Sequence, residues 1–168
     1  MASPGPRPRD ALQVGIRLFR EAAMSTLTLE QLALRHGFTP GVRQGEFAHF
    51  AHANVPDAAL RPSRNFFHFF LESQPYREPA DRSRYYSLYT RFESLHAELA
   101  SELRAEFGLP RFSGRYGTPG YPLALTGSDH LALWHLGRCY LSLETDLASY
   151  HDAFNVEVFI GFVEDVTW

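Results

Sequence analysis

RSRYYSLYTRFESLHAELASELRAEF, residues Arg82–Phe107, is the stretch that decides the fold. Its apolar side chains recur at spacings of one, three and four, as they do along one stripe of an α-helix. Asp81 or Ser83 can cap the start of this helix, and Gly108 followed by Pro110 ends it. The predicted helix is roughly 39 Å long, enough to cross a whole sheet. The stripe consists of Tyr85, Leu88, Tyr89, Phe92, Leu95, Leu99 and Leu103.

Three strands are predicted after this helix, and they form an antiparallel meander. Residues His130–Leu136 and Cys139–Thr145 flank a two-residue turn that starts with Gly137, and Phe154–Phe162 follows them. Side chains alternate between the two faces of such a hairpin. The face that we expect to lie against the helix carries Trp134, Leu141 and Leu143. The opposite face carries His135, Tyr140 and Glu144.

The residues before the long helix contain one clear strand and one ambiguous segment. Asn65–Leu71 (NFFHFFL) is apolar on both faces apart from one histidine, which predicts an interior strand with Phe66 and Phe70 in the core. Glu46–Asn54 (EFAHFAHAN) fits either a strand or a helix, because its apolar residues do not separate the two periods.

Two shorter helices are predicted near the amino terminus. The first begins at Asp10, which can serve as its N-cap. The second covers Leu29–His36, with Thr28 as cap and Gly37 at its end. Residues 1–9 are rich in Pro and Arg and predict a disordered lead.

The predicted fold is a single α+β domain over residues 10–168. An antiparallel sheet of about five strands carries the long helix across one face, with the two N-terminal helices beside it. Residues 39–41, 55–64 and 111–122 contain Gly or Pro at turn positions and are interpreted as loops. A chain of 168 residues can fold without a metal or a disulfide, and its single cysteine, Cys139, excludes an internal disulfide.

Charge and hydropathy narrow the classes of function. The net charge of −3 argues against broad nucleic-acid binding, which is typical of basic domains. The sequence has no run of about 18 apolar residues that would span a membrane, and its first residues lack the apolar core of a secretory signal. We therefore expect a cytoplasmic protein without a membrane or nucleic-acid partner. No catalytic residue and no cofactor are predicted, so the chain is not expected to be an enzyme.

Two segments imitate known motifs. Leu32–Phe47 has the small residue and the turn glycine of a helix-turn-helix, which leaves a DNA-binding regulator as an alternative function. Gly41 and Gly45 would lie inside its recognition helix, where each costs about 1 kcal/mol. Residues 127–130 (GSDH) have the residue types of a hydrolytic triad, but neighbours on one loop cannot form the geometry of a triad.

Three histidines are the candidates for a metal or small-molecule site: His49, His52 and His68. On a helix His49 and His52 would share one face, whereas on a strand residues three apart point to opposite faces. A protein that binds a small molecule or a metal through these histidines, and that could be an enzyme, is the main alternative function.

A row of glutamates lies along the exposed side of the predicted long helix. Glu98, Glu102 and Glu106 recur every four residues, which makes either a solvated face or an acidic strip that attracts a basic partner. Together with the outward face of the hairpin, this row is the surface expected to contact a protein partner. Its residues are Glu98, Glu102, Glu106, His135, Tyr140 and Glu144.

The order of features in the C-terminal half resembles that of small bacterial immunity-type proteins of polymorphic toxin systems. The resemblance is carried by Phe107-Gly108-Leu109-Pro110, Trp134-x-x-Gly137, Leu141-x-Leu143 and Val156-x-Val158. It implies a non-enzymatic inhibitor that binds and neutralises a cognate toxin, with a basic toxin domain as its partner.

Overall fold

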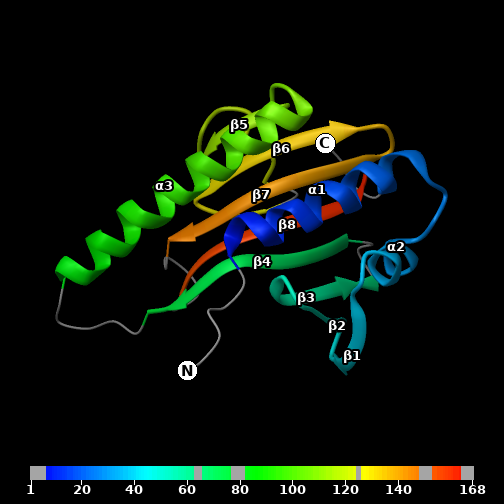
Figure 1. Cartoon of the computed structure of the whole chain (residues 1–168). Helices are drawn as coiled ribbons and strands as arrows, with labels where there is room; N and C mark the ends of the chain where they lie inside the picture. Colours follow the sequence, from blue (N-terminus) through cyan, green and yellow to red (C-terminus); the bar gives the residue numbers. More distant parts are fainter. Residues whose placement is uncertain (1–6, 63–65, 77–81, 124–125, 148–152, 164–168) are drawn as a thin grey trace.

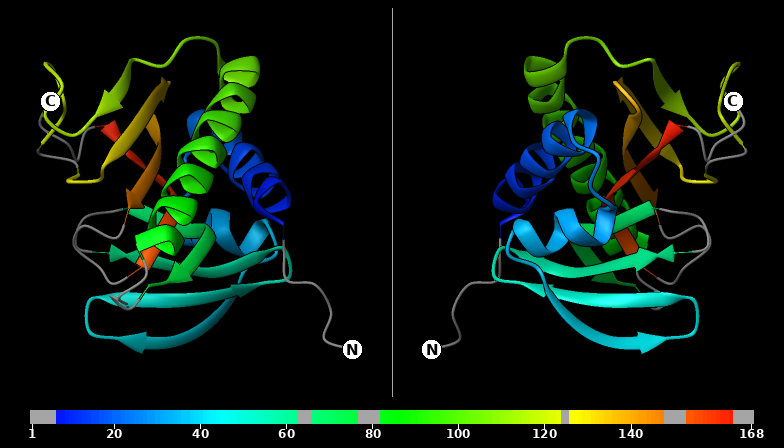
Figure 2. Two further views of the ribbon diagram at one scale, coloured as in Figure 1. Left: turned by 90° about the vertical axis from the view of Figure 1, so that its left-hand side faces the viewer. Right: turned by 90° about the vertical axis from the view of Figure 1, so that its right-hand side faces the viewer.

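The computed structural model describes residues 7–62, 66–76, 82–123, 126–147 and 153–163. Within this part of the chain, eight strands form one antiparallel sheet in the order β1-β2-β3-β4-β8-β7-β6-β5. The strands are β1 (Thr39–Gln44), β2 (Phe47–His52), β3 (Val55–Arg61), β4 (Phe66–Pro75), β5 (Phe112–Arg115), β6 (His130–Leu136), β7 (Cys139–Leu147) and β8 (Ala153–Phe162). The helices lie together on one face of the sheet (Figures 1 and 2) and are α1 (Pro8–Met24), α2 (Leu29–Arg35) and α3 (Arg82–Phe107).

The α+β class holds, but the sheet has eight strands and not about five. The strands that the sequence did not predict are β1, β3 and β5, which were all interpreted as loops. Every residue of β1 is exposed, so this strand has no alternation of buried and exposed side chains. Pro56 interrupts β3, and β5 has only four residues, one of them Gly114. The ambiguous segment around residues 46–54 is also a strand, β2.

The long helix α3 has the predicted bounds and the predicted buried side. Its stripe is most deeply buried at Leu88, Phe92, Leu99 and Leu103, and Leu95 packs partly buried against the same core. Gly108, at φ +78°, ends the helix in the left-handed region that favours glycine. The proposed cap Asp81 lies outside the described residues.

The predicted hairpin register is confirmed. Trp134 on β6 pairs with Leu141 on β7, and both are buried on the helix side of the sheet. The indole Nε1 of Trp134 donates a hydrogen bond to the carbonyl of Gly108, 3.0 Å away, and thereby joins the end of α3 to the hairpin. Gly137 has φ +56°, and a Cβ added there would lie 2.8 Å from the carbonyl oxygen of Ala23, so the turn requires glycine twice over.

The face of β4 that packs against the helices is not the face that the sequence predicted. Phe67 and Phe69 are fully buried under the helices, whereas Phe66 and Phe70 are half-buried on the far face. The helix α1 approaches this strand closely at Gly15, where an added Cβ would lie 2.8 Å from the ring of Phe69. The sequence could not distinguish the two faces, because both are phenylalanine-rich.

The two N-terminal helices are present, with one correction. The helix α1 begins at Pro8 rather than at Asp10, and its N-cap Arg7 makes no side-chain capping bond. The predicted disordered lead over residues 1–9 therefore overlaps the helix, and residues 1–6 lie outside the described part. The helix α2 has the predicted cap, since Thr28 and Gln31 form a capping box.

The sheet has one covered face and one open face. In the described part of the chain all helices lie on the covered face (Figure 2), and we call the other face the open face. Its central strands carry polar side chains instead of core residues: Asn155 and Glu157 on β8, and Ser142, Glu144 and Asp146 on β7. None of the described helices is both long enough and apolar enough to cross a bilayer.

Candidate functional site

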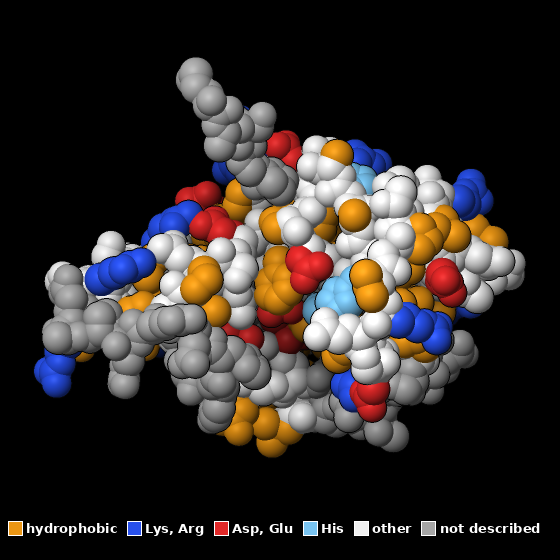
Figure 3. Space-filling model, turned by 90° about the horizontal axis from the view of Figure 1, so that it is seen from below, with side chains coloured by type: hydrophobic (Ala, Val, Ile, Leu, Met, Phe, Trp, Pro, Cys, Tyr) orange, Lys and Arg blue, Asp and Glu red, His pale blue; other side chains and the backbone are white. Residues whose placement is uncertain are grey.

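The open face contains a hollow with a volume of about 650 Å³, well inside the range of small-molecule sites. It lies over β4, β8 and β7 and reaches the loop that joins β5 to β6. Seen from below, the molecular surface is hollowed near its centre, with acidic side chains deep inside and hydrophobic and histidine side chains beside them (Figure 3). The hollow therefore combines polar and apolar walls.

Strand register places these walls at different positions along the same strands. On β8, Phe159 pairs with His68 of β4, and two residues earlier Glu157 pairs with Glu144 of β7. Residues two apart on a strand share a face, so the rings and the carboxylates are neighbours on the open face. The aromatic wall consists of Phe47, Phe66, Phe159 and Tyr116. The acidic wall consists of Glu144, Glu157 and Asp146.

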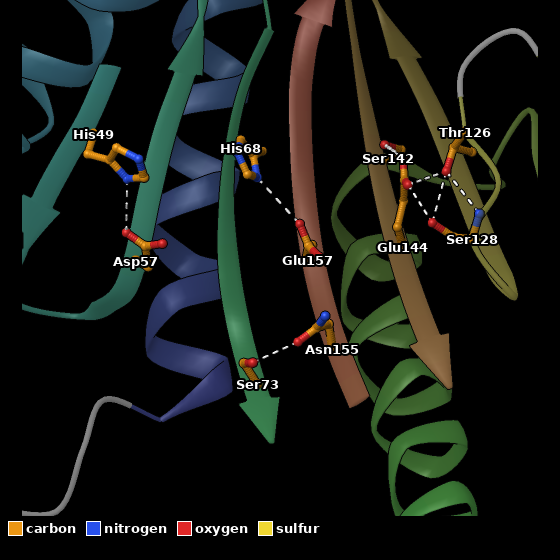
Figure 4. A network of polar contacts seen from close by, with 10 residues as sticks. All are labelled: His49, Asp57, His68, Ser73, Thr126, Ser128, Ser142, Glu144, Asn155 and Glu157. Carbon is orange, nitrogen blue, oxygen red and sulfur yellow. Dashed lines mark hydrogen bonds and ion pairs between the residues drawn. The ribbon is translucent and has the colours of Figure 1, made fainter. Parts of the chain in front are cut away.

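Glu144 lies at the floor of the hollow and contacts three hydroxyl groups (Figure 4). Ser142 donates a hydrogen bond of 2.7 Å to its Oε1, and Ser128 donates one of 2.7 Å to its Oε2. Thr126 also donates to Oε2. Both carboxyl oxygens are thus satisfied within the chain, and only 7% of the residue is exposed.

Burial favours a protonated Glu144, whereas its bonds to the three hydroxyls favour the ionised form. The hydroxyl oxygens of Thr126 and Ser128 are 2.9 Å apart, so together with Oε2 they form a triangle of three close oxygen contacts. Burial raises the pKa of Glu144 from its ordinary 4.5 to about 7; the hydroxyl bonds oppose this shift and the nearby Glu157 adds to it.

His68 joins the acidic and aromatic walls. Its Nδ1 lies 3.4 Å from the Oε2 of Glu157, and its ring stacks on Phe159 with centroids 5.1 Å apart and planes 11° apart. Phe47 and Phe66 meet the same ring edge-on, at 5.8 and 5.9 Å. His68, one of the three candidate histidines, is half-buried on the open face.

The loop beside the hollow is fixed to itself by polar contacts. The hydroxyl of Tyr121 donates to the carbonyl of Ser128 over 2.7 Å, and the backbone N–H of Ser128 donates to the hydroxyl of Thr126 over 3.1 Å. Burial raises the pKa of Tyr121 further above neutral pH than that of an ordinary tyrosine. The loop residues Thr126 and Ser128, whose hydroxyls contact Glu144, are therefore held in place by other residues of the same loop.

The glutamate row on α3 is used inside the molecule. Glu98 and Glu102 both pair with Arg9 of α1, at 3.7 and 2.8 Å, and Glu106 pairs with Arg20 of the same helix. These ion pairs join α1 to α3 on the covered side of the sheet. Much of the negative charge that the sequence suggested for a partner is thus balanced by arginines of the chain.

The other three predicted partner residues lie on the open face. His135 is exposed, but Tyr140 is buried, with its ring above Gly161, where an added Cβ would lie 2.5 Å from the tyrosine oxygen. Glu144 is the floor of the hollow. The six predicted residues therefore occupy opposite sides of the sheet and do not form one continuous surface.

The three histidines do not come together either. His49 and His68 lie on the open face, where His49 is 3.7 Å from Asp57, whereas His52 lies on the covered face against Phe38. This separation follows from the strand geometry of β2. Among the described residues, no three His, Cys, Asp or Glu side chains are grouped so as to hold a metal ion.

Neither of the two segments that imitate known motifs has the geometry of its motif. The segment that would carry a recognition helix forms strands β1 and β2, so a helix-turn-helix over residues 32–47 is wrong. In the GSDH segment, Ser128 faces Glu144, whereas His130 lies on the covered face with His96, at a ring distance of 5.4 Å. A triad is therefore not formed there.

Sequence reasoning missed most of the hollow. It selected Glu144 for the outward face of the hairpin, but not Glu157, Thr126 or Ser128. The alternation of Val156 and Val158 already placed Glu157 on the same face as Glu144, and this was a usable signal. The position of the loop that carries Thr126 and Ser128 had no such signal, because it depends on contacts between distant residues.

Compared with protein-family models, with curated proteins and with solved structures, the chain shows no match. The function is argued below from the geometry of the hollow.

Proposed function

We propose that this protein binds a small organic molecule in the hollow on the open face of its sheet. The observation that carries the proposal is the composition of the hollow: about 650 Å³ of space with aromatic rings along one part and carboxyl groups along another. Small-molecule sites combine such apolar walls with a few convergent polar groups. The aromatic rings supply contact area, and the carboxyl groups supply orientation and selectivity.

The paired glutamates support this proposal energetically. Glu144 and Glu157 face each other directly on neighbouring strands, an arrangement that destabilises a sheet when both are charged. Burying a carboxyl group adds a further cost. Residues that destabilise the fold are concentrated at functional sites. A carboxyl group with a strongly shifted pKa beside a hollow, as at Glu144, is also typical of a functional site.

The proposal is for binding without a chemical step. Both oxygens of Glu144 are engaged by hydroxyls of the chain, so this carboxyl group supports the loop as much as it faces the hollow. Glu157 and Asp146, which also line the hollow, are the carboxylates that a ligand would meet.

Blocking the hollow provides a direct test. Gly127 lines the hollow, and a Cβ added there meets no heavy atom within 4 Å, so the position has room to start a side chain and Gly127→Trp adds bulk at the wall of the hollow. We expect wild-type protein to bind at least one of three probes, phenethylamine, 2-phenylethanol or phenylacetate, in ligand-observed NMR. We expect Gly127→Trp to weaken that binding by at least about tenfold, because it removes space that the ligand fills.

The matched control is Gly127→Ala, which adds a methyl group at the same position and should bind the probes as wild type does. Thermal unfolding of both variants checks that the fold is intact. If all three probes fail to bind wild type, or if they bind Gly127→Trp and wild type equally, the hollow is not a binding site.

The second candidate function is the immunity-type inhibitor that the C-terminal resemblance implies. What supports it is that segments that carry the resemblance meet in the fold: the indole N–H of Trp134 donates to the carbonyl of Gly108, and Leu143 of β7 pairs with Val158 of β8. Its partner would be a protein with a basic surface, in contact with the glutamate row on α3.

This candidate predicts a stoichiometric complex whose stability depends on the glutamate row. Affinity purification from the source organism should recover a one-to-one partner with wild type. The triple variant Glu98→Gln, Glu102→Gln, Glu106→Gln should lose it. The double variant Arg9→Gln, Arg20→Gln breaks the same internal ion pairs but leaves the glutamates charged, so it should retain the partner. Loss of the partner in both variants would assign the effect to the packing of α1 on α3.

A further inference from the structure

We propose that the ligand of the hollow is an organic cation: a protonated amine carried on an apolar or aromatic body. This inference rests on the proposed function, because it names the chemical class of molecule that the same hollow would accept. Three features of the hollow lead to it, namely the sign of its charges, the position of its paired glutamates and the nature of its opposite wall.

The charges around the hollow are acidic. Among the described residues that line it, three have carboxyl groups, Glu144, Glu157 and Asp146, and none is an arginine. Of the described residues that line the hollow, His68 is the one with a basic side chain, and its Nδ1 lies 3.4 Å from the Oε2 of Glu157. The nearby Arg61 stacks on the ring of Phe47 and pairs with Glu46, so its charge is balanced at the rim. An anionic ligand would meet like charge on entry.

The paired glutamates mark a place for positive charge. Glu157 is directly opposite Glu144 across two neighbouring strands, and two ionised carboxylates in this position repel each other. In the protein without ligand, a proton on Glu144 relieves this repulsion. An ammonium group beside Glu157 would relieve the same repulsion, whereas a neutral ligand would not.

The aromatic wall suits the remainder of such a molecule. The rings of Phe66 and Phe159 are 5.5 Å apart, and His68 contacts both Phe159 and Glu157, so the aromatic wall adjoins the carboxylates. Aromatic rings attract a cation placed within about 6 Å of their centroids, and they also pack against apolar groups. One molecule can therefore contact both walls if its charged end and its apolar end lie a few bonds apart.

The test compares three probes of similar size that differ in charge: phenethylamine is a cation, 2-phenylethanol is neutral and phenylacetate is an anion. Their dissociation constants are measured by NMR titration of the full chain at low ionic strength. We expect phenethylamine to bind at least about tenfold more tightly than either of the other two, because it alone carries a positive charge and can form an ion pair with a carboxylate.

Two isosteric variants assign the effect to the hollow. Glu157→Gln removes the charge of one of the two carboxylates that a ligand would meet, Glu157 and Asp146, and should weaken the preference for phenethylamine at least about threefold. Glu106→Gln removes an acidic charge from α3, remote from the hollow, and should leave the preference unchanged.

The outcomes separate this inference from the function on which it rests. If 2-phenylethanol or phenylacetate binds as tightly as phenethylamine, and Gly127→Trp blocks that binding, the hollow binds small molecules but not as a cation site, and the inference is overturned. The inference is also overturned if Glu157→Gln prefers phenethylamine over the other two probes by the same factor as wild type does. If none of the probes binds, the proposed function fails together with the inference.

Discussion

Replacing Phe69 by alanine is expected to lower the free energy of unfolding by about 3–5 kcal/mol, the cost of removing a fully buried aromatic ring and leaving a cavity. Phe69 is 0% exposed and lies on the covered face of β4, beneath α1. Its ring fills the space left by Gly15, where the helix comes closest to the sheet, and it contacts Phe67 and Phe38 at centroid distances of 6.1 Å. The measurement is equilibrium unfolding in urea.

The neighbouring residue supplies the control. Phe70 is half-buried on the open face, so Phe70→Ala should cost only about 1–2 kcal/mol. The comparison also tests the orientation of the strand. If Phe70→Ala were more destabilising than Phe69→Ala, β4 would present to the helices the face that the sequence alone suggested.

Glu144→Gln is expected to stabilise the protein near pH 8 by about 2–3 kcal/mol more than it does near pH 5. The reason is the raised pKa of the buried Glu144, about 7 in the folded protein against an ordinary 4.5. A glutamine keeps the size of the side chain but never carries a charge, and the hydroxyls next to its amide nitrogen can accept a hydrogen bond instead of donating one. The variant therefore behaves as Glu144 does when it is protonated.

The sign follows from proton binding. Between pH 4.5 and about pH 7 the folded protein holds a proton on Glu144 that the unfolded chain has released. The stability that this proton provides is fully present below the lower of these pKa values and is lost as the pH rises through the upper one. His96 works in the opposite direction, since burial lowers its pKa from 6.5 to about 4, so folding excludes a proton that the unfolded chain binds. Subtracting the Glu144→Gln curve from the wild-type curve cancels the contribution of His96.

The measurement is urea unfolding of both proteins at about pH 5 and about pH 8, in the absence of ligand. A difference between the two proteins that does not change with pH would show that Glu144 has the same pKa in the folded and unfolded states. Ser73→Ala provides a control, because Ser73 lies on the same face and bonds to Asn155 but does not titrate.

The elements with strong local patterns were predictable from the sequence. The helix α3 shows a long apolar period with Gly108 at its end, and the hairpin of β6 and β7 has a two-residue turn with clear alternation on both sides. The strand β1 could not be predicted, since all of its residues are exposed and it is held by pairing with β2 rather than by burial. Backbone pairing leaves no trace in side-chain composition.

The candidate site was only partly accessible to the same reasoning. Glu144 was placed on the correct face of the hairpin, but as a surface residue for a partner, because nothing local shows that a loop covers it. Glu157 is thirteen positions further along the chain, and it meets Glu144 only because β8 pairs with β7 in one particular register. Thr126 and Ser128 contact the same carboxyl group from the loop that precedes β6.

By itself, the sequence determined the α+β class, the extent of α3 and the face of the hairpin that would be buried, because each of these follows from the spacing of apolar side chains between near neighbours. The tertiary structure alone decided that eight strands share one sheet, that Phe69 and not Phe70 lies under the helices, and that Glu144 and Glu157 meet in a hollow beside aromatic rings. These outcomes depend on which distant segments pair and on which face of a doubly apolar strand meets a helix. Such choices are settled by packing over the whole chain.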